Sequence, residues 1–140
     1  MWKALLAAVA IGLSACTPLP PHPMEAQAKR FERLPDKSVI YVVRSDPDFR
    51  DLPAPLVLDD AGGATTYPGT FFRWEVPPGR HRIAGLAGDS GQIVLETRAG
   101  GVYYVRQMVS GWRSPNSTLQ LVTEPTGQAI AMRGSFLPVQ

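Results

Sequence analysis

From Ser38 onward the sequence is made of short apolar runs, rich in β-branched and aromatic residues, that are separated by Gly, Pro and Asp. Such runs between turn-forming residues are typical of β-strands. Roughly seven strands can be counted in this way, at the spacing expected of a sandwich. The sequence therefore predicts an all-β fold, a small antiparallel β-sandwich of about seven strands.

Two segments define the expected core. Ser38–Arg44 (SVIYVVR) is almost uniformly apolar, which predicts a central strand that is covered on both faces. Thr70–Val76 (TFFRWEV) alternates in the manner of a half-buried strand. Its expected core face carries Phe72, Trp74 and Val76.

Three turn signals separate the predicted strands. Residues 60–63 (DAGG) can supply positive φ and predict a hairpin. Residues 77–79 (PPG) predict a reversal after which residues 80–87 return as the paired strand. Residues 99–101 (AGG) predict a further hairpin between two strands.

The N-terminal residues 1–15 have the three parts of a secretory signal peptide. Lys3 is followed by a short apolar stretch and then by small residues at the expected cleavage site. The apolar stretch is too short to cross a bilayer, which takes about 20 residues, and prolines follow it at once. We expect residues 1–15 to be a signal peptide and not a membrane-spanning helix.

The tetrapeptide Leu13-Ser14-Ala15-Cys16 resembles the lipobox of bacterial lipoproteins. The resemblance implies that the signal peptidase recognises Leu13, Ser14 and Ala15 and that Cys16 is acylated. Two or three acyl chains, at about 0.8 kcal/mol per buried methylene, would make a lasting membrane anchor. The alternative is an ordinary secretory signal in which Cys16 is incidental.

By resemblance to sorting in enteric bacteria, Thr17 in the position where a retained lipoprotein often has Asp implies the periplasmic face of the outer membrane. The expected location is therefore the bacterial cell envelope, with a lipid anchor. Removal of residues 1–15 leaves 125 residues, enough for one domain.

Residues 16–37 are expected to contain the lipidated cysteine, a tether and an arm, and residues 38–140 the β-sandwich domain. The tether, residues 17–23 (TPLPPHP), is rich in proline and should be stiff and extended. The arm, residues 24–34, contains good helix formers and fits either a short helix or an ordered arm that ends before Pro35. Near the other end of the chain, residues 128–132 fit either a short helix or an edge strand.

Composition limits the classes of partner and cofactor. The chain has 14 basic and 12 acidic residues, and the basic ones are scattered, so nucleic acid is not an expected partner. Cys16 is the only cysteine, so no disulfide is expected in the folded domain. With only His22 and His81 besides this cysteine, no soft-metal site and no cofactor are expected.

Four segments of the chain resemble those of a known family: SVIYVVR, LDDAGG, YPGTFFRWEVPPGRHRI and TRAGGVYYVRQMVSG. In their order and spacing they resemble an uncharacterised bacterial lipoprotein family, catalogued as domain of unknown function 2846, over residues 28–122. The resemblance implies a small β-sandwich, similar in style to the PEGA modules of surface proteins, and it implies no catalytic residue. Family members usually carry Val-Asp-Gly in the first hairpin, where this chain has Leu58-Asp59-Asp60, so the turn type stays open.

A catalytic interpretation would begin with His81. Ser90 and either Asp89 or Asp59 would complete a hydrolytic triad. Residues 89–91 (DSG) contain only part of the turn that presents a nucleophilic serine. We favour a structural role for His81 at the start of a strand.

Asp46, Asp48 and Asp51 raise the question of a calcium loop. The segment lacks the Gly and the late Glu of an EF-hand, and Pro47 and Arg50 argue against it. We favour a solvated loop with local turn bonds, and no metal site is expected.

Two loops, residues 46–55 and 111–117, are the expected contact regions. Phe49 belongs to the first, and Trp112, Arg113 and Asn116 belong to the second. Trp112 is the aromatic residue best placed for exposure, and a sugar ring could pack on it. The alternative is that its ring folds back over the end of the sandwich.

We therefore expect a lipid-anchored, non-catalytic binding or scaffolding module of the cell envelope, with the membrane as a partner through Cys16 and an envelope protein or peptidoglycan as a further partner. The alternative function is a cell-wall or surface-glycan binding module that uses Trp112, Arg113 and Asn116. A hydrolase built on His81 is the least favoured function.

Overall fold

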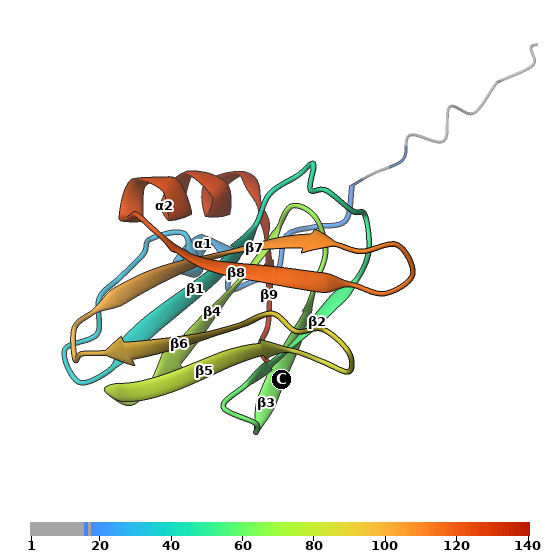
Figure 1. Ribbon diagram of the computed structural model, residues 1–140. Helices are drawn as coiled ribbons and strands as arrows, with labels where there is room; N and C mark the ends of the chain where they lie inside the picture. The colour runs from blue at the N-terminus through green and yellow to red at the C-terminus, as the bar shows by residue number, and fades with distance from the viewer. Residues whose placement is uncertain (1–15, 17) are drawn as a thin grey trace, which may run out of the picture.

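The computed structural model describes Cys16 and residues 18–140, in which two β-sheets face each other and two helices cover one outer face (Figure 1). This confirms the predicted all-β sandwich. The expected signal peptide, with Leu13, Ser14 and Ala15, lies outside the described residues, and so does Thr17, the residue expected to act in sorting.

The larger sheet has the strand order β8-β7-β1-β4-β9. β1 pairs antiparallel with β4 but parallel with β7, and β9 is parallel to β4, so this sheet is mixed and not wholly antiparallel. Its strands are β1 (Ser38–Arg44), β4 (Thr70–Val76), β7 (Val102–Ser110), β8 (Asn116–Val122) and β9 (Ser135–Leu137).

The smaller sheet has the order β3-β2-β5-β6 and is antiparallel throughout. Its strands are β2 (Ala54–Leu58), β3 (Gly62–Thr66), β5 (Gly79–Gly85) and β6 (Gln92–Thr97). The described residues thus form nine strands. β9 (SFL) was not indicated by the sequence pattern, and β3 (GGATT) was indicated only by the predicted hairpin, because neither contains a run of large apolar residues.

β1 is buried along its whole length, which confirms the predicted central strand. Ile40 and Val42 belong to the core between the two sheets. Val39, Tyr41 and Val43 belong to a second core, between the larger sheet and the segments that cover its outer face. The uniformly apolar sequence of this strand therefore follows from burial on both faces.

β4 also contributes to both cores. Phe72 and Val76 lie in the core between the sheets, and Trp74 packs against it, so the predicted core face is confirmed. Phe71, on the opposite face, is fully buried in the second core and contacts the ring of Phe136.

The second core is covered by α1 (Glu25–Ala28), by α2 (Glu124–Arg133) and by the segment between α1 and β1 (Figure 1). α1 is shorter than the helix predicted over residues 24–34, and Phe31 has a positive φ of 53° beyond its end. α2 resolves the ambiguity of residues 128–132 in favour of a helix. The hydroxyl of Tyr41 donates a 2.6 Å hydrogen bond to the carbonyl of Ala28, which ties α1 to β1.

Alkaline pH is expected to destabilise the fold through Tyr41. Burial raises the pKa of Tyr41 to about 12, whereas a tyrosine in an unfolded chain titrates near pH 10. Between these values the folded state keeps a proton that the unfolded state has lost, so stability falls as pH rises, by about 2 kcal/mol near pH 12. Urea titrations at several alkaline pH values should show this fall, and Tyr41→Phe should reduce it; an unchanged pH dependence in that variant would contradict the prediction.

Two of the predicted strand pairings are wrong. Residues 77–79 do not form a hairpin, because β4 pairs with β1 and β9 while β5 pairs with β2 and β6. Residues 99–101 likewise connect β6 of one sheet to β7 of the other. Both turns reverse the chain as expected, but they carry it across the sandwich.

The predicted hairpin of β2 and β3 is present, but the positive φ angles of its turn are not at the glycines of residues 60–63. Positive φ is adopted by Asp59 (50°) and Asp60 (56°), and the N–H of Ala61 bonds to the carbonyl of Leu58 at 3.1 Å. Gly62 and Gly63 lie within β3. Aspartate tolerates the left-handed region better than most residues do, so this turn needs no glycine at its centre.

The strand directions give the sandwich two distinct ends. One end, called the loop end below, contains the connections of residues 45–53, 67–69, 86–91 and 111–115. The other, called the turn end, contains the connections of residues 35–37, 59–61, 77–78 and 98–101. β9 starts at the loop end, since Ser135 pairs with Thr70 and donates its N–H to Gly69.

Candidate functional site

The long loop after β1, residues 45–53, is bound to the sandwich by Arg44. This side chain is fully buried, and its Nε donates to Oδ2 of Asp48 at 2.6 Å. The remaining nitrogens donate to backbone carbonyls: Nη1 to Leu52 and Thr66 at 2.7 and 3.1 Å, and Nη2 to Arg50 at 2.7 Å. A buried charge with all of these bonds holds the loop in one arrangement.

Asp48 connects the same loop to β7. Its Oδ2 accepts a second hydrogen bond from the N–H of Val109 at 3.0 Å, and its side chain is almost entirely buried. The expected solvated loop with a local turn bond is present, since Asp46 and Asp51 are exposed and the N–H of Phe49 donates to Oδ1 of Asp48 at 2.8 Å. The buried contacts of Arg44 and Asp48, which the sequence did not indicate, fix this loop to the sandwich. No group of three or more metal-ligating side chains is present in the part of the chain that the structure describes.

A short chain of buried polar groups lies beneath the loop end. Oγ1 of Thr66 donates to Oε1 of Gln107 at 2.6 Å, and Nε2 of Gln107 donates to Oγ of Ser117 at 2.9 Å. These residues come from β3, β7 and β8, so the contacts join both sheets. Fully bonded polar groups of this kind make the position of each strand specific.

The loop of residues 45–53 and the β7–β8 turn meet through Arg50. Its Nε donates to the carbonyl of Gly111 at 2.8 Å, and its guanidinium lies 5.3 Å from the centre of the Trp112 ring. Trp112 is 82% exposed and Phe49 is 75% exposed. Trp112, the aromatic residue expected to be exposed, is thus at the surface, and its ring does not fold back over the sandwich.

The structure separates the other two predicted contact residues. Arg113 is exposed beside Trp112 in the same turn. Asn116 begins β8, and its Oδ1 accepts a 3.3 Å hydrogen bond from the hydroxyl of Ser90. Gly111 has a φ of 105°, and a Cβ atom there would collide with the carbonyl of Ser114, so the turn that presents Trp112 requires glycine.

His81, the predicted catalytic candidate, is buried in β5. Its Nδ1 lies 2.6 Å from Oδ2 of Asp59, and its Nε2 lies 2.6 Å from the carbonyl oxygen of Pro77. Both ring nitrogens thus have a polar partner within hydrogen-bond distance, which fixes the orientation of the ring. Asp59 also accepts the N–H of Arg82 at 2.7 Å. His81 therefore links the two turns of residues 59–61 and 77–78.

The structure does not assemble the hydrolytic triad that was considered. Of the possible partners, Asp59 does bond to His81, but neither ring nitrogen of His81 bonds to Ser90. Ser90 and Asp89 lie at the loop end, where Oδ1 of Asp89 accepts the N–H groups of Gly91 and Ser117 at 2.9 and 2.8 Å. His81 and Ser90 therefore lie at opposite ends of the sandwich, in separate sets of hydrogen bonds.

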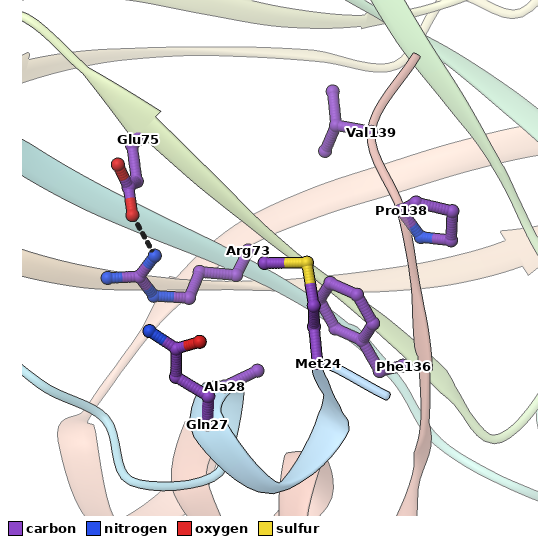
Figure 2. Close-up of a pocket in the computed structure, with 8 residues that line it drawn as sticks. All are labelled: Met24, Gln27, Ala28, Arg73, Glu75, Phe136, Pro138 and Val139. Carbon is purple, nitrogen blue, oxygen red and sulfur yellow. Dashed lines mark hydrogen bonds and ion pairs between the residues drawn. The ribbon is translucent and has the colours of Figure 1, made fainter. Parts of the chain in front are cut away.

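A cavity of about 320 Å³ lies between α1, β4 and the C-terminal segment (Figure 2). Its walls are largely apolar, and the charged groups in it are Arg73 and Glu75, which form an ion pair with each other. Burial lowers the pKa of Arg73, but bonding to Glu75 outweighs this effect and the net shift raises it. Because the two charges already satisfy each other, the cavity offers no free charge to a ligand. It is lined by Met24, Gln27, Ala28, Arg73, Glu75, Phe136, Pro138 and Val139.

Sequence reasoning found the two exposed aromatic residues but missed the arginines that position them. Arg44 and Arg50 were grouped with the scattered basic residues, since nothing in the local sequence distinguishes a buried arginine from a solvated one. One signal was present: Arg44 directly ends the most apolar strand of the chain.

Among the described residues, no helix has the length and apolar character needed to cross a bilayer. Comparison with models of known protein families gives no match, and a search of curated proteins gives none.

Proposed function

We propose that this protein is a lipid-anchored, non-catalytic binding module of the bacterial cell envelope, tethered through acylated Cys16. Its binding surface is the pair of exposed aromatic residues, Phe49 and Trp112, at the loop end. The resemblance of the N-terminal tetrapeptide to a lipobox supports the anchor. The resemblance of Thr17 to the sorting position of enteric lipoproteins supports the periplasmic face of the outer membrane.

The observation that carries the proposal is the way in which Phe49 and Trp112 are held. Both rings are largely exposed, although each ring loses apolar contacts by facing water. Their loops are fixed beneath them by Arg44, Asp48 and Arg50. A rigid frame under exposed aromatic side chains lowers the entropic cost of binding and is typical of a recognition surface.

Photo-crosslinking in intact cells tests this function. A crosslinking amino acid at Phe49 or Trp112 is expected to give discrete adducts, whereas the same amino acid at Arg98, exposed at the turn end, is expected to give few. Cys16→Ser is expected to abolish fatty-acid labelling and to leave an unprocessed precursor. Equal adduct yields from both ends, or normal acylation of Cys16→Ser, would contradict the proposal.

One observation favours a second candidate, a cell-wall or surface-glycan binding module. Arg50 covers one face of the Trp112 ring and stands within cation–π distance of it. The ring is nevertheless 82% exposed, which leaves room for a sugar to pack on it. Muropeptide or glycan adducts in the crosslinking experiment, in place of protein adducts, would support this candidate.

A further inference from the structure

We infer that the loop end of the sandwich rests on the bilayer interface, with Phe49 and Trp112 inserted among the lipid headgroups. This inference rests on the proposed function, because it needs the anchor at Cys16, and it names the membrane surface as the partner of the aromatic pair. Three features of the domain support this orientation: the positions of the exposed apolar side chains, the point where the tether leaves the domain, and the charges around the two rings.

Exposed apolar side chains are distributed unequally between the two ends. Four large ones lie in the connections of the loop end: Phe49, Tyr67, Leu86 and Trp112. Among the described residues, none lies in the connections of the turn end, and the exposed apolar side chain nearest to that end is Leu121 in β8. A soluble domain with no partner gains nothing by collecting such side chains at one end, so this end is the one with a partner.

The tether leaves the domain at the same end. The ring of His22 lies 5.1 Å from the ring of Phe136, near the start of β9. A carboxylate oxygen of Glu25 accepts the N–H of Phe136 at 3.1 Å, which fixes the start of α1 there as well. In Figure 1 the segment before α1 departs on the side of the view where the β7–β8 turn lies.

The length of the tether keeps this end near the membrane. Residues 18–23 contain four prolines in six positions, so they form an extended segment of about 3 Å per residue, or about 20 Å in all. In a chain anchored at Cys16 the start of β9, where the tether joins the loop end, therefore lies within about 20 Å of the acyl chains, and the turn end lies on the far side of the sandwich. Peptidoglycan or a distant protein would be met more readily by the turn end.

The chemistry of the loop end fits a bilayer interface. Tryptophan is enriched where headgroups meet acyl chains, because its ring is apolar and its N–H is polar. Arg50 and Arg113 flank Trp112, where their guanidinium groups can reach lipid phosphates while their stems cover apolar surface. The exposed Asp46 and Asp51 offset these charges, so binding is expected to depend on the aromatic rings more than on anionic lipid.

Depth-dependent fluorescence quenching tests the inference on the acylated protein in vesicles of phosphatidylethanolamine and phosphatidylglycerol. In a Trp74→Phe background, Trp112 is the only tryptophan left after removal of the signal peptide. Phospholipids brominated near the headgroup should quench it strongly. The matched control, Arg98→Trp with Trp112→Phe in the same background, should be quenched several-fold less.

A second measurement avoids the change at Trp74. Because acylation consumes the thiol of Cys16, Phe49→Cys and Arg98→Cys each supply one reactive thiol for a spin label. The label at position 49 should be shielded from a water-soluble relaxation agent, and the label at position 98 should not. Equal quenching or equal shielding at the two ends, in a protein shown to be acylated and bound to vesicles, would overturn this inference and leave the proposed function standing. Absence of acylation in cells would overturn both.

Discussion

Arg44→Met is expected to lower the free energy of unfolding by about 3–5 kcal/mol, which is the range for breaking a buried ion pair by removing one partner. Methionine fills a similar volume but donates no hydrogen bond. The change leaves the buried carboxylate of Asp48 without its charge partner. It also leaves the carbonyls of Arg50, Leu52 and Thr66 without the donors that they now have. Lysine cannot replace arginine here, because one ammonium group cannot reach four acceptors in these directions.

Arg50→Met is the matched control, because it removes the same side-chain type from the loop that Arg44 holds in place. Arg50 makes one hydrogen bond and one contact with Trp112 near the surface, so its loss is expected to cost about 1 kcal/mol or less. Urea titrations of the chain from Pro18 to Gln140 would compare the two variants. A loss of stability in Arg44→Met no larger than in Arg50→Met would show that the loop does not depend on its buried arginine.

The buried strands were predictable because each strand face that is buried consists of apolar residues, and this pattern can be seen in the sequence. β1 has apolar residues on both faces, and both faces are covered, one by the smaller sheet and the other by the helices. β9 was not predicted, and β3 was predicted only through the turn before it, because GGATT and SFL have too few large apolar residues to show an alternating pattern. Their strand conformation follows from pairing with β2 and β4, which the local sequence does not specify.

The wrong strand pairings have a similar physical cause. A turn such as Pro77-Pro78-Gly79 specifies that the chain reverses, and the same residues suit a hairpin and a crossing between sheets. The choice depends on long-range pairing: β1 takes β7 as its parallel neighbour, although about sixty residues separate them in the sequence. Because β5 pairs with β2 and not with β4, His81 at the start of β5 lies next to the turn after β2 and contacts Asp59 there.

The candidate site was predictable only in part, for reasons of the same kind. The position of Trp112 in a polar, turn-rich segment indicated exposure, and Phe49 was named only as a residue of the other contact loop; both are exposed. That the two segments touch depends on Arg50, whose partner Gly111 lies 61 residues further along the chain. A contact of this range leaves no periodicity in the sequence, so the rigidity of the surface became visible only in the structure.

Gly127→Val is expected to lower the free energy of unfolding by about 2–3 kcal/mol, because it overpacks the contact between α2 and the larger sheet. A Cβ atom at Gly127 would overlap the side chain of Tyr104, which is buried and stacked on Tyr41 with 5.3 Å between ring centres. The ring of Tyr104 cannot move away without disturbing that stack, so α2 must move. Movement of α2 would also break the 3.1 Å hydrogen bond from Gln128 to the Tyr104 hydroxyl.

Ala129→Val separates this steric effect from the conformational cost of valine in a helix. Ala129 is exposed on α2, two residues from Gly127, so valine there should cost only about 0.5 kcal/mol in helix propensity. Urea titrations would give the difference in stability, and the near-ultraviolet circular dichroism of the tyrosines would report whether the Tyr41–Tyr104 stack is disturbed. Since the helix propensity of valine exceeds that of glycine, propensity alone would make Gly127→Val slightly stabilising. A large loss of stability at Gly127 with a small one at Ala129 therefore has to come from the close approach of α2 to Tyr104, whereas equal effects would mean that α2 shifts at little cost and does not fix the second core.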